Sequence, residues 1–264
     1  MNCKKENGIP AAAGGVDPGK LPYQKENENV RKALYQGVSA LRRQCGISFA
    51  DYPLSVPMLC QKQLGIPVGY LPLRTPGLKG MASFGGGCGY AGDVILINSR
   101  QGLRERNFIC AHELMHLTFH RREPGYSFTC YEAPPSGKSA YLEWQANEGA
   151  AELLVPARLL LPIIGQAFGG LRDWRDFERF KQDTASRFGV APTVISYRYE
   201  SLRFEISQYL SGVPLHHIQL LTRRQKARLP TPASLNDLQH RLFLREQNHN
   251  ETRKLNWRML AVTP

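Results

Sequence analysis

The stretch "ICAHELMHLTFH" (residues 109–120) contains three histidines, His112, His116 and His120, at steps of four, with Glu113 directly after the first. Histidines at this spacing lie along one face of a helix. At ~1.5 Å per residue, the first and third are about 12 Å apart, too far to share one ion through bonds of about 2.0–2.1 Å. His112 and His116 can converge on one metal. We therefore expect His120 to lie behind the site or at the surface.

Glu113 is expected to project beside this metal, where the general base of HExxH zinc hydrolases stands. The longer pattern HExxHxxGxxH does not apply, because position 119 is Phe and position 122 is Arg. Apolar neighbours on both sides of the motif predict that the helix is buried. Burying two imidazoles and a carboxylate without a partner is costly, and a bound metal would remove that cost.

A third protein ligand is expected in "YLEWQANEGAAELLVP" (residues 141–156), because a catalytic zinc takes three protein ligands and keeps one position open. On a helix, Glu143 shares a face with Asn147, whereas Glu148 and Glu152 point elsewhere. The alanines in the middle of the segment allow close packing against another helix. Glu143 is therefore favoured over the other acidic residues as the third ligand.

Composition and charge set the broad class of the protein. The chain has 264 residues, 42% hydrophobic and 21% charged, which indicates a globular protein. Its net charge is +12, and residues 221–264 supply +6 of this from nine Lys/Arg and three Asp/Glu. This basic segment could attract nucleic acid or an acidic partner, or it could be a solvated tail.

The cysteines and the apolar segments indicate a compartment. Six cysteines without a CxxC pair suggest free thiols in a reducing environment. The first residues have no apolar core of the kind that a secretory signal needs. The most apolar window, "LLVPARLLLPIIGQAFGGL", contains Arg158 and two prolines, so we expect a buried helix and turn there. The protein is expected to be soluble and cytoplasmic, without a membrane partner.

Local patterns predict the order of elements. A glycine-rich hairpin is expected within "GMASFGGGCGYAGDVILINS", and its "GCGYAG" is not a nucleotide-binding motif because a strand follows it rather than a helix. Apolar spacing predicts helices in "NVRKALYQGVSALRRQC", "LSVPMLCQKQLGI", about 104–120, about 140–154, "DWRDFERFKQDTASRF" and "PTVISYRYESLRF", and strands in "PVGYLPL" and "DVILINS".

Three segments resemble the ImmA/IrrE-type metallo-endopeptidases over roughly residues 50 to 205: "PLSVPMLCQKQLGIPV", "ILINSRQGLRERNFICAHELMHLTFH" and "EWQANEGAAELLVP". The resemblance implies that His112, His116 and Glu143 bind Zn2+ and that Glu113 is catalytic. It also implies a substrate class, the helix-turn-helix repressors of mobile elements or stress responses. The chain departs from the family pattern at two positions, Met115 in place of a small residue and Gly149 in place of an aromatic one, and both could loosen the packing.

The expected fold is α+β: a mainly helical, zincin-like peptidase domain with a small antiparallel sheet, followed by a helix-turn-helix-like helical unit. The predicted boundaries are a flexible N-terminus at 1–29, the peptidase domain at 30–170, the helix-turn-helix-like unit at 171–212, and a basic, loosely ordered C-terminal tail at 213–264.

The expected mechanism is zinc-dependent hydrolysis of a peptide bond, with Glu113 taking a proton from water and passing it to the leaving amine. A donor should stabilise the oxyanion, and the candidates are Tyr126, Tyr131, Tyr141, Tyr197 and Tyr199. The hairpin is the expected edge for a peptide substrate, although it could equally be structural. Cys88 and Cys130 could touch the zinc as inhibitory thiolates, but buried or idle cysteines are the more ordinary interpretation.

A second activity is raised by Ala185, Gly189 and Ile195, whose spacing is typical of a helix-turn-helix. The helix from Pro192 offers few side chains that could contact bases, among them Thr193, Ser196 and Arg198. A scaffold or substrate-docking role is favoured over DNA binding. The alternative functions are a DNA-binding regulator or antitoxin-like protein whose metal site is structural or inactive, and a helical module with an accidental HExxH.

Overall fold

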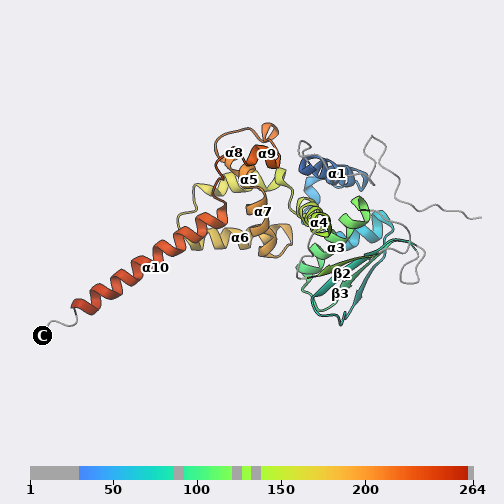
Figure 1. Cartoon of the computed structure of the whole chain (residues 1–264), viewed down its shortest axis with the longest axis horizontal. Helices are drawn as coiled ribbons and strands as arrows, with labels where there is room; N and C mark the ends of the chain where they lie inside the picture. The colour runs from blue at the N-terminus through green and yellow to red at the C-terminus, as the bar shows by residue number, and fades with distance from the viewer. Residues whose placement is uncertain (1–29, 86–91, 121–126, 132–137, 261–264) are drawn as a thin grey trace, which may run out of the picture.

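The computed structural model describes residues 30–85, 92–120, 127–131 and 138–260 (Figure 1). The N-terminal 29 residues, Cys88, Tyr126 and most of "GCGYAG" lie outside the described residues. The first part of the chain forms α1 (Val30–Gln44), η1 (Phe49–Asp51), α2 (Val56–Leu59), the π-helical turn η2 (Cys60–Leu64), β1 (Val68–Leu71), β2 (Leu78–Ser83), β3 (Val94–Asn98), α3 (Leu103–Phe119) and β4 (Ser127–Tyr131).

The remaining chain is helical. It forms α4 (Lys138–Leu154), α5 (Ala157–Phe168), α6 (Trp174–Phe188), α7 (Pro192–Ser201), α8 (Arg203–Leu210), η4 (Leu215–His217), α9 (Arg223–Lys226) and α10 (Leu235–Leu260). The molecule is thus mostly helical with one small sheet, as the expected α+β class requires. Among the described residues, no single helix is long and apolar enough to cross a membrane, and the pair 140–154 and 157–168, which passes that test together, is bent by 64°.

The sheet is mixed, which corrects the expectation of an antiparallel one. Its strand order is β1-β3-β2-β4, with β1 and β3 parallel and the other pairs antiparallel. β3 lies between β1 and β2, which run in opposite directions, so it has to be parallel to one of them. The predicted hairpin of β2 and β3 forms, but both strands are internal. The edges belong to β1 and to β4, a strand that the sequence patterns did not predict.

Helix α3 crosses close to the sheet, and Gly80 on β2 permits this approach. A Cβ atom at position 80 would lie 2.6 Å from Cγ2 of Ile109 and 3.2 Å from Oε1 of Glu113. Any side chain there would push β2 away from the helix. The backbone of β2 therefore passes directly over the carboxylate of Glu113.

The close packing of α3 and α4 depends on Met115 and Gly149. A Cβ atom at position 149 would lie 2.8 Å from Sδ of Met115, and Met115 is fully buried. The large side chain on one helix thus fills the space that glycine leaves on the other. The expectation that these two departures from the family pattern loosen the packing is wrong, because each compensates for the other.

The C-terminal segment is more ordered than the loosely ordered tail expected from residue 213 onward. α10 begins at Leu235, which is 1% exposed, and it packs against α6 through a ring contact between Trp174 and Phe243 with centroids 5.4 Å apart. Trp174 Nε1 also donates to Glu246 Oε2 at 2.6 Å. Beyond these contacts, α10 extends away from the rest of the chain (Figure 1).

Candidate functional site

Three of the residues singled out in the sequence meet at one point between α3 and α4. Nε2 of His112 lies 3.1 Å from Nε2 of His116 and 3.1 Å from Oε2 of Glu143. Nε2 of His116 lies 3.4 Å from Oε1 of the same carboxylate. We call His112, His116 and Glu143 the donor triad. All three side chains are largely buried. They come from two helices, α3 and α4, and lie about 30 positions apart in the chain.

The outer nitrogens of the two histidines have partners that fix where their protons lie. Asn147 Oδ1, which can only accept, is 3.0 Å from Nδ1 of His112. Gln145 Oε1 is 3.0 Å from Nε2 of His120, and Nδ1 of His120 is 2.9 Å from Nδ1 of His116. His120 therefore donates to Gln145 and accepts from His116.

These partners leave a lone pair on the Nε2 atom of each histidine in the donor triad. Burial, followed by the neighbouring His116, lowers the pKa of His120 to about 3, so this ring is neutral and can accept a hydrogen bond. Burial also lowers the pKa of His116. Metal-bound histidines commonly donate their other N–H to such a partner, which fixes the tautomer and the ring orientation. His120, expected either behind the site or at the surface, is 5% exposed and lies behind it.

The carboxylate of Glu143 is ionised. Burial opposes its ionisation, but positive charge at the neighbouring His112 and His116 outweighs burial and lowers its pKa to about 2, and a metal cation between the three residues would supply that positive charge in place of protons. Two neutral imidazoles and one carboxylate are the protonation states in which these side chains bind metal ions.

The spacing of the donor triad fits a tetrahedral zinc ion. Bonds of about 2.0–2.1 Å at tetrahedral angles separate neighbouring ligand atoms by about 3.3 Å. The three measured separations are 3.1, 3.1 and 3.4 Å. Each of these atoms carries a lone pair, and a cation between them would remove the repulsion that such close lone pairs otherwise create. The residues present therefore fit the metal that this donor set would take.

Glu113 projects from α3 toward β2 of the sheet, beside His112 of the donor triad. It is fully buried, and neither carboxylate oxygen has a hydrogen-bond partner of good geometry in the described part of the chain. Burial, and then the charge of Glu143, raise its pKa well above the usual range, and the backbone amide of Ala82 offsets this only in part. A carboxyl group with a raised pKa beside a metal site has the properties of a general acid and base.

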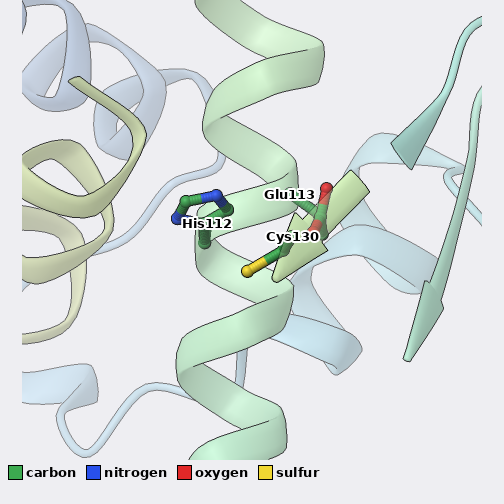
Figure 2. A group of neighbouring side chains, drawn as sticks. All are labelled: His112, Glu113 and Cys130. Atoms are coloured by element: carbon green, nitrogen blue, oxygen red, sulfur yellow. The ribbon is translucent and has the colours of Figure 1, made fainter. Parts of the chain in front are cut away.

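β4 closes the other side of the site. The ring of Phe128 stacks on His116 with centroids 4.2 Å apart and an interplanar angle of 17°. Two residues further, Cys130 lies beside Glu113, with its sulfur on the side toward His112 (Figure 2). His112, Glu113 and Cys130 each have one donor atom within 4.8 Å of the other two. They form a second possible metal-binding group, which shares His112 with the donor triad.

The site opens into a cavity of about 390 Å³. One wall comes from α3 and α4, with His112, Glu143 and Asn147, and Cys130 lines the cavity from β4. The opposite wall is the beginning of α7, including Thr193 and Tyr197. The helix expected to contact DNA or a docked substrate thus faces this cavity with its first two turns.

The five candidate oxyanion donors have different positions. Tyr126 is outside the described residues, and the side chain of Tyr131 is not described. Tyr141 stacks on Trp144, and Tyr199 is buried away from the cavity at 2% exposure. Of the three whose side chains are described, only Tyr197 lines the cavity, where its hydroxyl donates to Glu148 Oε2 at 2.7 Å.

The opposite face of α4 carries a network of buried charges. Glu148 binds Arg31 at 2.9 Å and Arg198 at 3.2 Å, and Glu152 binds Arg198 at 2.6 Å. Burial opposes ionisation of Glu148, but the two arginines outweigh it and lower its pKa to about 2. We call this network the buried ion cluster; its members are Arg31, Tyr35, Arg42, Glu148, Glu152, Tyr197, Arg198 and Glu205.

The buried ion cluster explains two points raised by the sequence. Glu148 and Glu152 do point away from the donor triad, and they are held there by arginines from α1 and α7. Arg198, one of the residues considered for DNA contacts, is 0% exposed and fully engaged in this network. It is therefore not available to contact bases.

Sequence reasoning missed several residues of the site. Helical spacing places Asn147 on the same face as Glu143 but does not by itself predict a role for it, and the motifs in the sequence do not indicate Gln145 or Phe128. The signal for Asn147 is its position one helical turn after Glu143. The signal for Phe128 is the alternation in "SFTCY", where Phe128 and Cys130 fall on one face of a short strand.

Comparison with known proteins agrees with this geometry. The family model described as Peptidase M78, IrrE N-terminal-like domain, matches residues 61–200, which is more than half of the chain. This stretch contains the donor triad, Glu113 and the cavity wall from α7. No curated protein gave a significant match. The chain therefore belongs to the family of IrrE N-terminal-like, M78-type peptidases.

Proposed function

We propose that the protein is a zinc-dependent endopeptidase in which His112, His116 and Glu143 bind the metal and Glu113 is the catalytic base. The main support is the geometry of the donor triad, three lone-pair atoms separated by 3.1–3.4 Å at one end of a cavity. Neither an accidental HExxH nor an ordinary buried helix needs three such atoms to converge. Asn147 orients the ring of His112 and His120 orients the ring of His116, so that both Nε2 atoms face Glu143 and can bind a metal.

Zinc at this position would supply Lewis-acid activation of water and of the scissile carbonyl. Glu113 would take a proton from the attacking water and pass it to the leaving amine. Its carboxylate lacks hydrogen-bond partners of good geometry in the described part of the chain, so it is free to bind water and transfer the proton. Its buried position beneath β2 excludes bulk solvent from this transfer.

Tyr197 is the proposed oxyanion donor, because it lines the cavity. Its hydroxyl donates to Glu148 in the substrate-free protein and would have to turn toward the substrate. Tyr197→Phe should lower turnover by about 100-fold or more, as expected for the loss of one such donor, while zinc content stays unchanged. Unchanged turnover in this variant would remove Tyr197 from the mechanism.

The substrate peptide is proposed to pair with the edge of β4 that has no partner among the described strands. The β2–β3 hairpin offers no free edge, because each of its strands is already paired on both sides. β4 has one partner in the described sheet and lies beside the donor triad through Phe128. An extended peptide added there would run along the cavity between α3 and α7.

A helix-turn-helix repressor of a mobile element or stress response is the proposed substrate, on the basis of the family resemblance. The alternative, a DNA-binding regulator with an inactive metal site, has less support because Arg198 is buried and Thr193 faces the cavity. We also propose that the protein cleaves this substrate in the cytoplasm.

Replacing Glu113 with Gln tests the proposal. Purified wild-type protein should contain one zinc per chain, and the variant should keep the zinc but cleave a co-expressed repressor about 10²–10⁴-fold more slowly. Glu178→Gln, on the surface of α6, serves as the matched control and should cleave normally. Absence of stoichiometric metal, or full cleavage by the Glu113→Gln protein, would contradict the proposed function.

A further inference from the structure

A second cavity, also of about 390 Å³, lies against α1 and shares no residue with the cavity beside the donor triad. Its other walls are the beginning of α5 and the segment 215–220 after α8. The residues of α1 that line it include one helix face, because they follow one another at steps of four, three and four: Lys32, Gln36, Ser39 and Arg43. A polar face of α1 is therefore turned toward a hollow in the structure.

The lining of this second cavity has an excess of positive charge. Four cationic residues line it: Lys32, Arg42, Arg43 and Arg158. Its two carboxylates are already compensated by arginines that do not line the cavity. Glu152 binds Arg198 at 2.6 Å, and Glu205 binds Arg31 at 3.1 Å. A hollow with surplus charge of one sign attracts ligands of the opposite sign, so this cavity favours an anion.

The three arginines of the lining come from two helices and differ in mobility. Arg42 is 7% exposed, and its guanidinium donates to the backbone oxygen of Glu152 at 3.2 Å and to Oγ of Ser39 at 3.1 Å. It therefore supplies a fixed positive charge. Arg43 on α1 and Arg158 on α5 are exposed, and neither guanidinium has an ion-pair or hydrogen-bond partner within the described part of the chain. These two can close on a ligand from different walls.

The rest of the lining indicates the kind of anion. Guanidinium groups bind the oxygens of a phosphate in pairs, which makes arginine the usual partner of phosphate esters. Apolar side chains complete the walls, among them Leu161, Leu215 and Ile218. The volume falls within the range of about 300–1,000 Å³ that is typical of sites for small molecules. The lining thus suits a molecule with a phosphate at one end and a less polar body at the other.

We propose that this second cavity binds a small phosphorylated molecule of the nucleotide class. The phosphate groups lie between Arg42, Arg43 and Arg158. The remainder of the ligand packs against the apolar residues of α5 and of the segment 215–220. The site is separate from the donor triad, and its existence depends neither on a metal nor on the proposed function.

Isothermal titration calorimetry with the purified full chain at about 0.15 M salt tests the proposal, with AMP and ADP as probes. ADP should bind with one site per chain and at least about tenfold more tightly than pyrophosphate or malonate, which lack the less polar body. The double variant Arg43→Glu with Arg158→Glu should weaken ADP binding at least about tenfold, because two charged hydrogen-bond donors are lost.

A matched control separates this local effect from a general change of charge. Arg172→Glu combined with Arg223→Glu alters the net charge by the same amount at two exposed positions outside the cavity, and this protein should bind ADP as the wild type does. Thermal melts confirm that each variant is folded. The milder pair Arg43→Gln with Arg158→Gln should also weaken binding, and it carries the test if the glutamate pair is unstable.

Four results would overturn the proposal. The first is the absence of saturable binding of AMP and ADP. The second is binding that is unchanged in both cavity variants, which would place the phosphates elsewhere, for instance on a metal. The third is binding of pyrophosphate or malonate as tight as that of ADP. The fourth is a single-stranded oligothymidine that binds more tightly than ADP and is lost in the same variants, which would make a nucleic acid the ligand.

Discussion

Gln145 provides the sharpest test of how the donor triad is oriented. Its Oε1 accepts from His120 Nε2 at 3.0 Å, and it is 1% exposed. Gln145→Leu keeps a side chain of similar size but removes the acceptor. His120 can then place its proton on Nδ1, facing Nδ1 of His116. His116 would respond by moving its own proton to Nε2, the atom that faces Glu143, and a protonated Nε2 cannot bind a metal.

The expected effect follows from two contributions. Loss of a partner that orients a metal ligand typically lowers metal affinity by about 10–100-fold, or ~1.4–2.7 kcal/mol. A buried donor left without an acceptor costs about 1–3 kcal/mol of folding stability. We therefore expect the Kd for zinc to rise about 10–100-fold, and the Tm of the metal-free protein to fall by about 2–12 °C at ~2–4 °C per kcal/mol.

Competition with a chromophoric chelator at fixed pH measures the zinc affinity. Gln145→Glu keeps an acceptor for His120 and should bind zinc at least as tightly as the wild type, provided that a thermal melt shows it to be folded. Gln182→Leu, an exposed glutamine on α6, should leave the affinity unchanged. Wild-type zinc affinity in Gln145→Leu would refute the assigned chain of hydrogen bonds, and so would a folded Gln145→Glu protein as weak as the Leu variant.

Three further results are expected. Arg198→Met leaves Glu148 and Glu152 without their shared buried partner and should cost about 3–5 kcal/mol in urea unfolding, whereas the surface pair lost in Arg179→Met should cost ~0–1 kcal/mol. Because the folded-state pKa of Glu148 is lowered to about 2, its contribution to stability is present above its ordinary pKa of 4.5 and is lost as pH falls from there toward 2; a Glu148→Gln protein with the same pH profile would contradict this. Gly149→Leu should destabilise the protein by about 1–3 kcal/mol through overpacking against Met115, and adding Met115→Gly should restore part of that loss in a double-mutant cycle.

The two helices that carry the donor triad could be predicted from the sequence because their signals are local. Apolar spacing around His112 and the alanine-rich segment after Glu143 each extend over more than three helical turns. The shared helix face also separates Glu143 from Glu148 and Glu152, and the structure places these side chains on different sides of α4. Their assignment as metal ligands stays a prediction until a metal is measured.

The parts that could not be predicted depend on contacts between distant segments. β4 is only five residues long, and its alternation is too short to stand out from the loops around it. The insertion of β3 between β1 and β2 is a matter of strand order, which side-chain patterns do not encode. The bond between Arg31 and Glu148 joins residues 117 positions apart, and nothing local to either residue indicates it.

The tail beyond residue 213 was misjudged for a similar reason. Its prolines and basic residues are typical of a solvated segment, and they do describe the stretch before α10. The order of α10 comes from Leu235 and Phe243, which pack against helices that precede them by dozens of residues. A helix of low overall hydrophobicity can therefore be anchored by a few apolar contacts at one end.

The buried ion cluster has a consequence for the order of events during synthesis. Arg31 is bonded to Glu148 and to Glu205, which lies 174 positions further along the chain. A nascent chain that has emerged only as far as α4 already carries the donor triad, yet its buried acids still lack Arg198 and the far side of the cavity has not been made. The complete cavity beside the donor triad would therefore form only after most of the polypeptide has left the ribosome.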